Sequence, residues 1–233
     1  MTEQPKRVHA AGPKAERTRA TILDAAEQVF AEKGYAAARL EDVAARVGIR
    51  RASIVYYFRD KRALYDAVLA GIFGELLDRY QTVLRAPAPL PQRIEAIVDA
   101  WVGFIAERPI VARLFLWEAA DGSPERTADA AGRGAAVIAA LTNAIEEGQR
   151  QGVFHPIDPI HFIVTIVGAT VFFVTATSRL VPQWPFDPLS PEQMAAHRAE
   201  LLGISRRLLG TGGAPPRRPA STIPNGRAVA LHR

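Results

Sequence analysis

The stretch that decides the fold is residues 39–58, RLEDVAARVGIRRASIVYYF. Apolar side chains recur at spacings of three and four over residues 40–47, which predicts a short amphipathic helix. Gly48 follows, where a helix can end in the left-handed conformation that glycine adopts readily. A second short helix then places Ile54 and Phe58 on its inner face. Two short helices joined by a tight turn are typical of a helix-turn-helix, whose second helix enters the DNA major groove.

The residues on either side extend this pattern. The segments RTR at 17–19, ILDAA at 22–26, FAEKGY at 30–35 and KRAL at 61–64 occur in that order around the VAA, GI and IVYYF segments of the stretch. Over about residues 16–76 the chain closely resembles the DNA-binding domain of the TetR/AcrR family of bacterial transcriptional regulators. The remaining two thirds is similar only in helical character and length. The resemblance implies that this remainder forms a dimer and an effector pocket.

The second helix and its flanks supply the expected DNA contacts. Arg50 and Arg51 stand at its start, where a recognition helix presents side chains to base edges. Either arginine can contact guanine in a bidentate manner or hold a phosphate. Lys61 looks like the lysine that grips the DNA backbone in related regulators. The expected DNA-binding residues are Arg39, Arg50, Arg51, Ala52, Ser53, Val55, Tyr56, Tyr57 and Lys61.

Several positions depart from the family pattern. Val55 stands where tyrosine is common, which removes one usual phosphate contact, and Tyr57 stands where histidine is frequent. Packing of Tyr57 under Phe58 is an open alternative to a DNA contact. Ala38 and Arg39 replace the usual Ser or Thr N-cap, a cap worth about 1 kcal/mol, so Arg39 is expected to contact a phosphate instead. These changes affect the operator sequence rather than the class of protein.

Charge is distributed unevenly along the 233 residues, whose net charge is +5. Residues 1–65 hold 13 Lys/Arg and 8 Asp/Glu, residues 66–210 hold 12 and 16, and residues 211–233 hold 4 and 0. Positive charge therefore coincides with the helix-turn-helix, as expected of nucleic-acid binding, although a merely solvated basic surface is the alternative. The absence of cysteine excludes disulfides and fits a reducing cytosol, and the first twenty residues lack the apolar region of a secretory signal. We predict a cytoplasmic protein.

Apolar periodicity and proline or glycine breaks predict an all-α chain. A helix from about residue 60 to 84 is too long for a small head and is expected to link the head to the body. Further helices are expected at 14–33, 92–107, 125–151, 160–179 and 190–209, and another opens at Pro109 and contains residues 114–117. The expected domains are a disordered arm at 1–13, a helix-turn-helix domain at 14–64, a helical effector-binding and dimerisation domain at 65–210, and a disordered basic tail at 211–233.

The body contains an uncharged segment at residues 162–177. It approaches the length of a membrane span, but it is short, interrupted by threonines and without a basic flank. Burial in a core or an interface explains it equally well, and we expect no membrane contact. The resemblance implies a four-helix dimer interface between the last long helices, for which residues 134–151 and 160–179 are the candidates.

An apolar cavity of the body could bind an effector, with His161 or Glu118 as a polar anchor. Filling of the core is the alternative for any one of these side chains. The candidates are Trp101, Phe104, Phe115, Trp117, Glu118, His161 and Phe172.

The sequence carries none of the common catalytic motifs. It has no Gly-rich phosphate loop, nucleophile elbow, zincin motif or cysteine nucleophile, and its histidines are too isolated for a metal site. We predict a regulator that is not an enzyme and uses no cofactor. It is expected to be a homodimeric repressor that an unknown small-molecule effector releases from a palindromic operator in double-stranded DNA. An effector-independent architectural DNA-binding protein and a membrane-associated helical protein are the alternatives.

Overall fold

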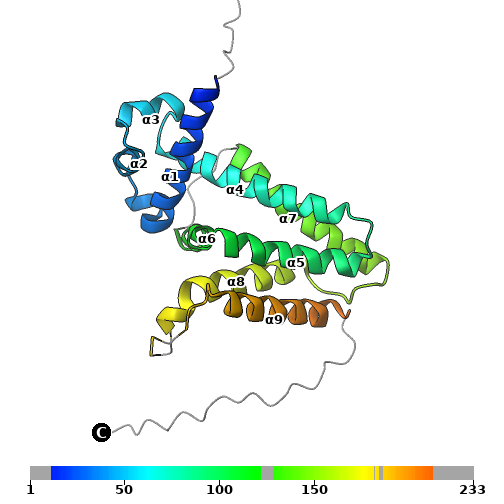
Figure 1. Ribbon diagram of the computed structural model, residues 1–233. Coiled ribbons are helices and arrows are strands. Elements are labelled where there is room, and N and C mark those ends of the chain that lie inside the picture. Colours follow the sequence, from blue (N-terminus) through cyan, green and yellow to red (C-terminus); the bar gives the residue numbers. More distant parts are fainter. Residues whose placement is uncertain (1–11, 122–127, 181, 184–185, 212–233) are drawn as a thin grey trace, which may run out of the picture.

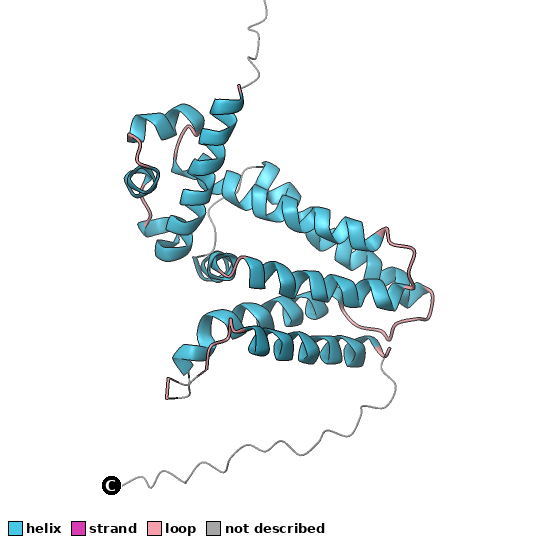
Figure 2. Ribbon diagram, in the orientation of Figure 1, coloured by secondary structure: helices cyan, strands magenta, loops and turns pink. Residues whose placement is uncertain are grey.

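The computed structural model of this chain describes residues 12–121, 128–180, 182–183 and 186–211, which form helices joined by loops and no strand (Figure 2). Figure 1 shows α1, α2 and α3 gathered in a head, from which α4 runs into a body made of the later helices. The predicted all-α architecture is confirmed. The helices are α1 (Pro13–Ala37), α2 (Leu40–Val47), α3 (Arg51–Tyr57), α4 (Lys61–Leu84), α5 (Leu90–Glu107), α6 (Ile110–Asp121), α7 (Ala128–Arg150), α8 (Pro159–Leu180) and α9 (Pro191–Leu209).

The expected arm and tail fall almost wholly outside the described residues. Within the described part, Pro13 already begins α1, and Thr211 is the last residue that the structure describes. The other helices begin and end within a few residues of the predicted bounds.

Two glycines set the geometry of the head because both have positive φ. Gly34, with φ 74°, breaks the helical conformation near the end of α1. Gly48, with φ 76° and ψ 32°, ends α2 in the left-handed conformation, and its N–H donates to the Ala44 carbonyl at 3.0 Å. A residue with a Cβ is strained in this conformation. The tight turn at Gly48 therefore fixes the angle between α2 and α3.

Helix α2 has no Ser or Thr cap, yet its first turn is not left uncapped. The Asp42 carboxylate accepts a hydrogen bond from the Arg39 N–H at 3.0 Å and lies 2.7 Å from the Lys33 ammonium. The Lys33 ammonium and then the Arg39 N–H hold the pKa of the Asp42 carboxyl below its ordinary value. Asp42 thus supplies part of the stabilisation that the missing hydroxyl would give.

The head core is continuous with the first turns of α4. The predicted apolar stripe of α1 is buried, from Ile22 at 0% exposure to Phe30 at 1%. The Tyr65 ring of α4 lies 4.8 Å from the ring centroids of Phe30 and Tyr35. Because α4 helps to close the head core and also packs in the body, it joins the two.

The body is layered. Helix α7 packs along α4, α5 lies between α4 and α9, and α6 contacts both α1 and α8 (Figure 1). Helix α9 packs on α5 and α8, and α8 also contacts α6 and α7. Helix α6 is therefore the element of the body that reaches the head.

Candidate DNA-binding surface and effector cavity

Helix α3 has one face in the head core and the other in solvent. Ile54 is 0% exposed and Phe58 is 4% exposed, whereas Val55 is 41% and Tyr56 is 83% exposed. The apolar anchor residues therefore hold the helix so that its outer face is open to a ligand. Of the expected DNA-binding set, Arg39, Arg50, Arg51, Ala52, Val55 and Tyr56 are exposed, and Ser53, Tyr57 and Lys61 are half-buried.

The arginines around α3 differ in how they are paired. Arg39 and Arg50 have no ion-pair partner among the described residues, although many other cations of the head do. The Arg51 Nε lies 3.0 Å from a carboxylate oxygen of Glu41, with the two side chains 60% and 62% exposed. An exposed pair of this kind contributes at most about 1 kcal/mol. Arg51 can therefore exchange Glu41 for a base or a phosphate at small cost.

Tyr57 is half-buried and packs against the head core, and its ring lies edge-on to Tyr56 at a centroid distance of 5.1 Å. The packing alternative for Tyr57 thus has direct structural support. Tyr56 is the more accessible of the two tyrosines.

The ammonium of Lys61 is bound within the protein. It donates to the carbonyl oxygens of Tyr35 at 2.8 Å, Ala36 at 3.2 Å and Ala38 at 3.0 Å, and it lies 4.5 Å above the Tyr35 ring. A lysine ammonium has three donors, and these carbonyls use all of them. In the structure Lys61 thus caps the end of α1 and ties it to α4, and the expected contact of Lys61 with the DNA backbone stays a prediction.

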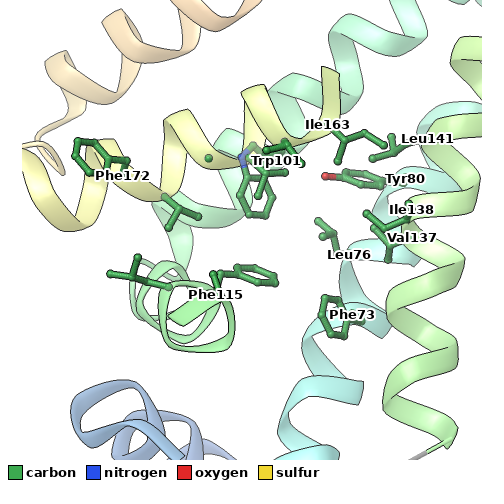
Figure 3. A pocket seen from close by; sticks show the side chains of 16 residues that line it. Phe73, Leu76, Tyr80, Trp101, Phe115, Val137, Ile138, Leu141, Ile163 and Phe172 are labelled. Carbon is green, nitrogen blue, oxygen red and sulfur yellow. The ribbon is translucent and has the colours of Figure 1, made fainter. Parts of the chain in front are cut away.

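A cavity of about 420 Å³ lies in the body between α4, α5, α6, α7 and α8 (Figure 3). Its interior wall is buried and includes Leu76 and Trp101, whereas its rim is exposed and apolar. This size is within the usual range for small-molecule sites. The lining residues are Phe73, Leu76, Tyr80, Trp101, Phe115, Leu116, Ala119, Val137, Ile138, Leu141, Ile163, Val164, Val167, Gly168, Val171 and Phe172.

Tyr80 brings a polar group to this apolar wall. The residue is 2% exposed, and Figure 3 shows its hydroxyl pointing across the cavity towards Trp101. The hydroxyl has no hydrogen-bond partner among the described residues. Burial raises the pKa of Tyr80 above its ordinary value of 10.0, so the phenol remains neutral. Sequence reasoning missed Tyr80 as a site residue, because in the sequence it only continues the apolar stripe of α4.

Comparison with known proteins assigns the chain to a family. Residues 22–68 match the family model of bacterial regulatory proteins of the tetR family, and residues 91–203 match a tetracyclin repressor-like C-terminal domain. The HTH-type transcriptional regulator RutR of Escherichia coli is 32% identical over 149 residues, which are 64% of this chain and 70% of RutR. The chain belongs to the TetR family. It is a DNA-binding transcriptional regulator with an N-terminal helix-turn-helix domain.

Solved TetR-family structures share the fold. A tetR-family regulatory protein from Rhodococcus RHA1 has a TM-score of 0.67 at 24% identity, covering 85% of this chain and 99% of that one. FadR of Bacillus subtilis, solved in complex with stearoyl-CoA, has a TM-score of 0.64 at 19% identity, covering 80% and 96%. Among relatives by sequence, the activator FasR of Mycolicibacterium smegmatis is 36% identical over 93 residues, 40% of this chain and 42% of FasR. The named relatives are regulators rather than enzymes, and they include an activator.

In this TetR-family regulator, three of the seven residues expected at the effector cavity line it: Trp101, Phe115 and Phe172. The other four do not line this cavity. Phe104 is 0% exposed and lies in the core beneath the Arg79 and Arg108 guanidinium groups. His161 is exposed in the first turn of α8. Trp117 and Glu118 point towards the head rather than into the cavity.

Trp117 and Glu118 explain why α6 contacts the head. The Trp117 indole N–H donates to the Ala31 carbonyl at 3.2 Å, and its ring lies directly against Gly34 of α1. The Tyr65 hydroxyl of α4 donates to the Glu118 carboxylate. On the other side of α6, the side chains of Phe115, Leu116 and Ala119 line the cavity. A single helix thus has one face on the cavity and one face on the head.

An ion network adds a second link between body and head. Arg108, in the corner between α5 and α6, donates to the carboxylates of Glu27 in α1 and Glu75 in α4. Arg79 also bonds Glu75 at 2.7 Å and reaches Glu107 at 2.6 Å. Arg108 therefore contacts the head, the connecting helix and the body at one point.

Helix α8 is, within the described part of the chain, the one helix with the length and composition to cross a membrane, but only 28% of its most apolar window is buried. Its exposed apolar residues include Ile160 at 47% and Val164 at 61%. Helix α7, the other expected dimer helix, packs along α4 and keeps an exposed outer side that includes Ile138 at 39%. Helix α8 has an uncovered apolar face.

Proposed function

We propose that this regulator is a homodimeric repressor whose two α3 helices bind the half-sites of a palindromic operator, and that a small molecule in the cavity releases it. The observation that carries the DNA-binding part is the position of α3. Buried Ile54 and Phe58 hold it so that Arg51 and Tyr56 face solvent. Arg39 and Arg50 flank it without ion-pair partners among the described residues.

The uncovered face of α8 supports the homodimer. Its exposed apolar residues Ile160, Val164 and Phe172 are four and eight residues apart and therefore lie on one side of the helix. On the adjoining α9, Ala195 and Ala199 are exposed and small, which would let another helix approach closely. A second copy that covers α8 and α9 would bury this apolar surface. Two linked heads would also gain affinity for a palindrome, since the second half-site binds at high effective concentration.

The link between cavity and DNA is proposed to run through α6 and α4 together. A ligand that displaces Phe115 on one face of α6 also moves Trp117 and Glu118 on the other. These side chains hold α1 and the first turns of α4, so the head turns relative to the body. The spacing of the two α3 helices then no longer fits the operator. A coupling of about 1–3 kcal/mol is sufficient for this effect.

This mechanism also bears on domain organisation. The expected division between a DNA-binding domain at 14–64 and a body at 65–210 falls inside α4. We place the functional boundary there because α4 belongs to both parts, and we place the protein in the cytoplasm, where its DNA lies.

The DNA-binding part is tested by selecting bound fragments from random duplex DNA and measuring affinity for the recovered sequence. Arg50→Ala and Arg51→Ala should each weaken binding about tenfold or more and relax preference at one base pair. Arg85→Ala, at the opposite end of α4, removes the same charge far from α3 and should leave affinity unchanged. Equal losses for Arg51→Ala and Arg85→Ala would refute recognition by α3.

The dimer is tested by sedimentation equilibrium. Ile160→Glu places a charge on the exposed face of α8 without altering a residue that lines the cavity. It should convert the dimer to monomer and lower operator affinity, whereas Ile138→Glu, on α7 at the rim of the cavity, should leave the dimer intact. A wild-type chain that sediments as a monomer at micromolar concentration would refute the homodimer.

A further inference from the structure

The cavity is lined almost entirely by apolar side chains, and this composition restricts the chemistry of a ligand that can bind there. None of the described residues that line it is charged. Most of its surface comes from aliphatic and phenylalanine side chains (Figure 3). The indole N–H of Trp101 lacks a partner among the described residues, but that nitrogen is fully enclosed by protein atoms. The Tyr80 hydroxyl is therefore the polar side-chain group that reaches the cavity.

The Tyr80 hydroxyl is not among the fully enclosed unpartnered polar atoms of the described residues, because it lies at the cavity, where a bound molecule can supply its hydrogen bond. The Tyr80 hydroxyl can donate to a carbonyl or ether oxygen, and it can accept from an alcohol. A carboxylate, phosphate or ammonium would lose its hydration here and find no opposite charge. The wall thus favours an uncharged ligand with a hydrogen-bonding oxygen and disfavours a charged ligand.

We propose that the effector is an uncharged, largely apolar molecule with one hydrogen-bonding oxygen, and that this oxygen bonds the Tyr80 hydroxyl inside the cavity. This inference rests on the proposed function only in giving the ligand a regulatory role, because binding of the ligand to the cavity can be measured without DNA. Tyr80 serves to position the ligand, and the apolar wall of α4, α7 and α8 supplies most of the binding free energy.

The experiment compares two probes of equal length by isothermal titration calorimetry on the full chain at neutral pH. Undecan-2-one carries one neutral oxygen, and undecanoate carries a charge on the same carbon frame. The ketone should bind at least about tenfold more tightly than the carboxylate, because the carboxylate has no compensating partner in the cavity. Undecanoate that binds as tightly as the ketone would overturn the proposal.

The role of Tyr80 is measured with a matched pair of Tyr→Phe variants. Tyr80→Phe removes the hydroxyl that faces the cavity, and Tyr56→Phe removes one on the exposed outer face of α3, away from the cavity. Ketone affinity should fall about fivefold in the Tyr80 variant and stay within error of wild type in the Tyr56 variant. An unchanged affinity for Tyr80→Phe, or an equal fall in both variants, would contradict the assignment.

The comparison of the ketone with the carboxylate uses only the wild-type chain. It therefore still tests the proposal if a variant fails to fold. Operator binding is measured in parallel. If neither probe binds while the chain still binds DNA, the ligand class is wrong but the DNA-binding function stands. If the ketone binds and does not release the operator, the ligand class is supported and the proposed release mechanism is not.

Discussion

Replacing Lys61 by methionine separates a structural role from a DNA contact. The substitution removes the ammonium and keeps an apolar stem of similar length. It deprives the Tyr35, Ala36 and Ala38 carbonyls of their donor, at distances of 2.8, 3.2 and 3.0 Å, and it removes the cation from above the Tyr35 ring. The end of α1 would then be tied to α4 by apolar contacts alone.

The expected loss of stability follows from how buried these bonds are. The bonds to Tyr35 and Ala38 are partly buried, whereas the bond to Ala36 is exposed and water can replace it. Each partly buried carbonyl left without its donor costs about 1 kcal/mol, and the cation–π contact adds about 0.5 kcal/mol. The total is about 2–3 kcal/mol, which corresponds to a Tm lower by roughly 5–10 °C in a chain of this size.

Two measurements decide between the roles. Thermal unfolding by circular dichroism gives the Tm, and the dependence of operator affinity on salt counts phosphate contacts. Lys61→Met should lower the Tm and leave the salt slope unchanged. Arg39→Met, which removes an exposed arginine without an ion pair among the described residues, should leave the Tm unchanged and reduce the slope by about 0.9. If Lys61→Met instead keeps the wild-type Tm and reduces the salt slope by about 0.9, the capping role is wrong.

Three further changes test other parts of the structure. Glu41→Gln removes the partner of Arg51 and a negative charge beside α3, so operator affinity in a fluorescence-anisotropy titration should rise about fivefold at low salt; a weaker complex would count against a contact by Arg51. Gly34→Ala should lower the free energy of unfolding in urea by about 2–3 kcal/mol, because φ is 74° there and a Cβ would lie 3.1 Å from the Trp117 ring; wild-type stability would show that α6 does not press on α1. The pKa of the Asp60 carboxyl is held below its ordinary 3.8 first by the Ala63 N–H and then by Arg59. Asp60 therefore stabilises the fold above pH 3.8, and this contribution is lost as the pH falls through the lower folded-state pKa. Asp60→Asn should unfold more readily at neutral pH and lose less stability on acidification, and an unaltered pH profile would contradict the link.

The sequence allowed the helices and the head to be predicted because both depend on local pattern. The apolar stripe from Ile22 to Phe30 is buried as its spacing indicates, and Gly48 ends α2 as its position indicates. A stripe of this kind shows which side of a helix faces inward. It does not show whether the inward side chain meets another side chain or an empty cavity, which is why Tyr80 was missed.

The roles of Lys61 and Trp117 could not be predicted for a different reason. The partners of Lys61 are backbone carbonyls at the end of α1, and main-chain groups leave no trace in the residue pattern. Helix α6 is apolar over most of its circumference, so sequence cannot tell its cavity face from its head face. Phe115 and Trp117 are two residues apart and point to different neighbours, a distinction that only the packing of α1 and α8 on either side of α6 makes.

The placement of α6 also limits how the two sites can be coupled. If α4 alone carried the signal, a ligand in the cavity would have to move a helix that is clamped to α7 along its length and fixed at its start by Lys61. Helix α6 packs on α1 and is bonded to the head by the Trp117 indole on Ala31, the Tyr65 hydroxyl on Glu118, and Arg108 on Glu27 at its preceding corner. Each such bond contributes about 0.5–3 kcal/mol. In the proposed mechanism, the loss of one of them in the ligand-bound state would supply a coupling of about 1–3 kcal/mol, without any break in the core that α4 shares between head and body.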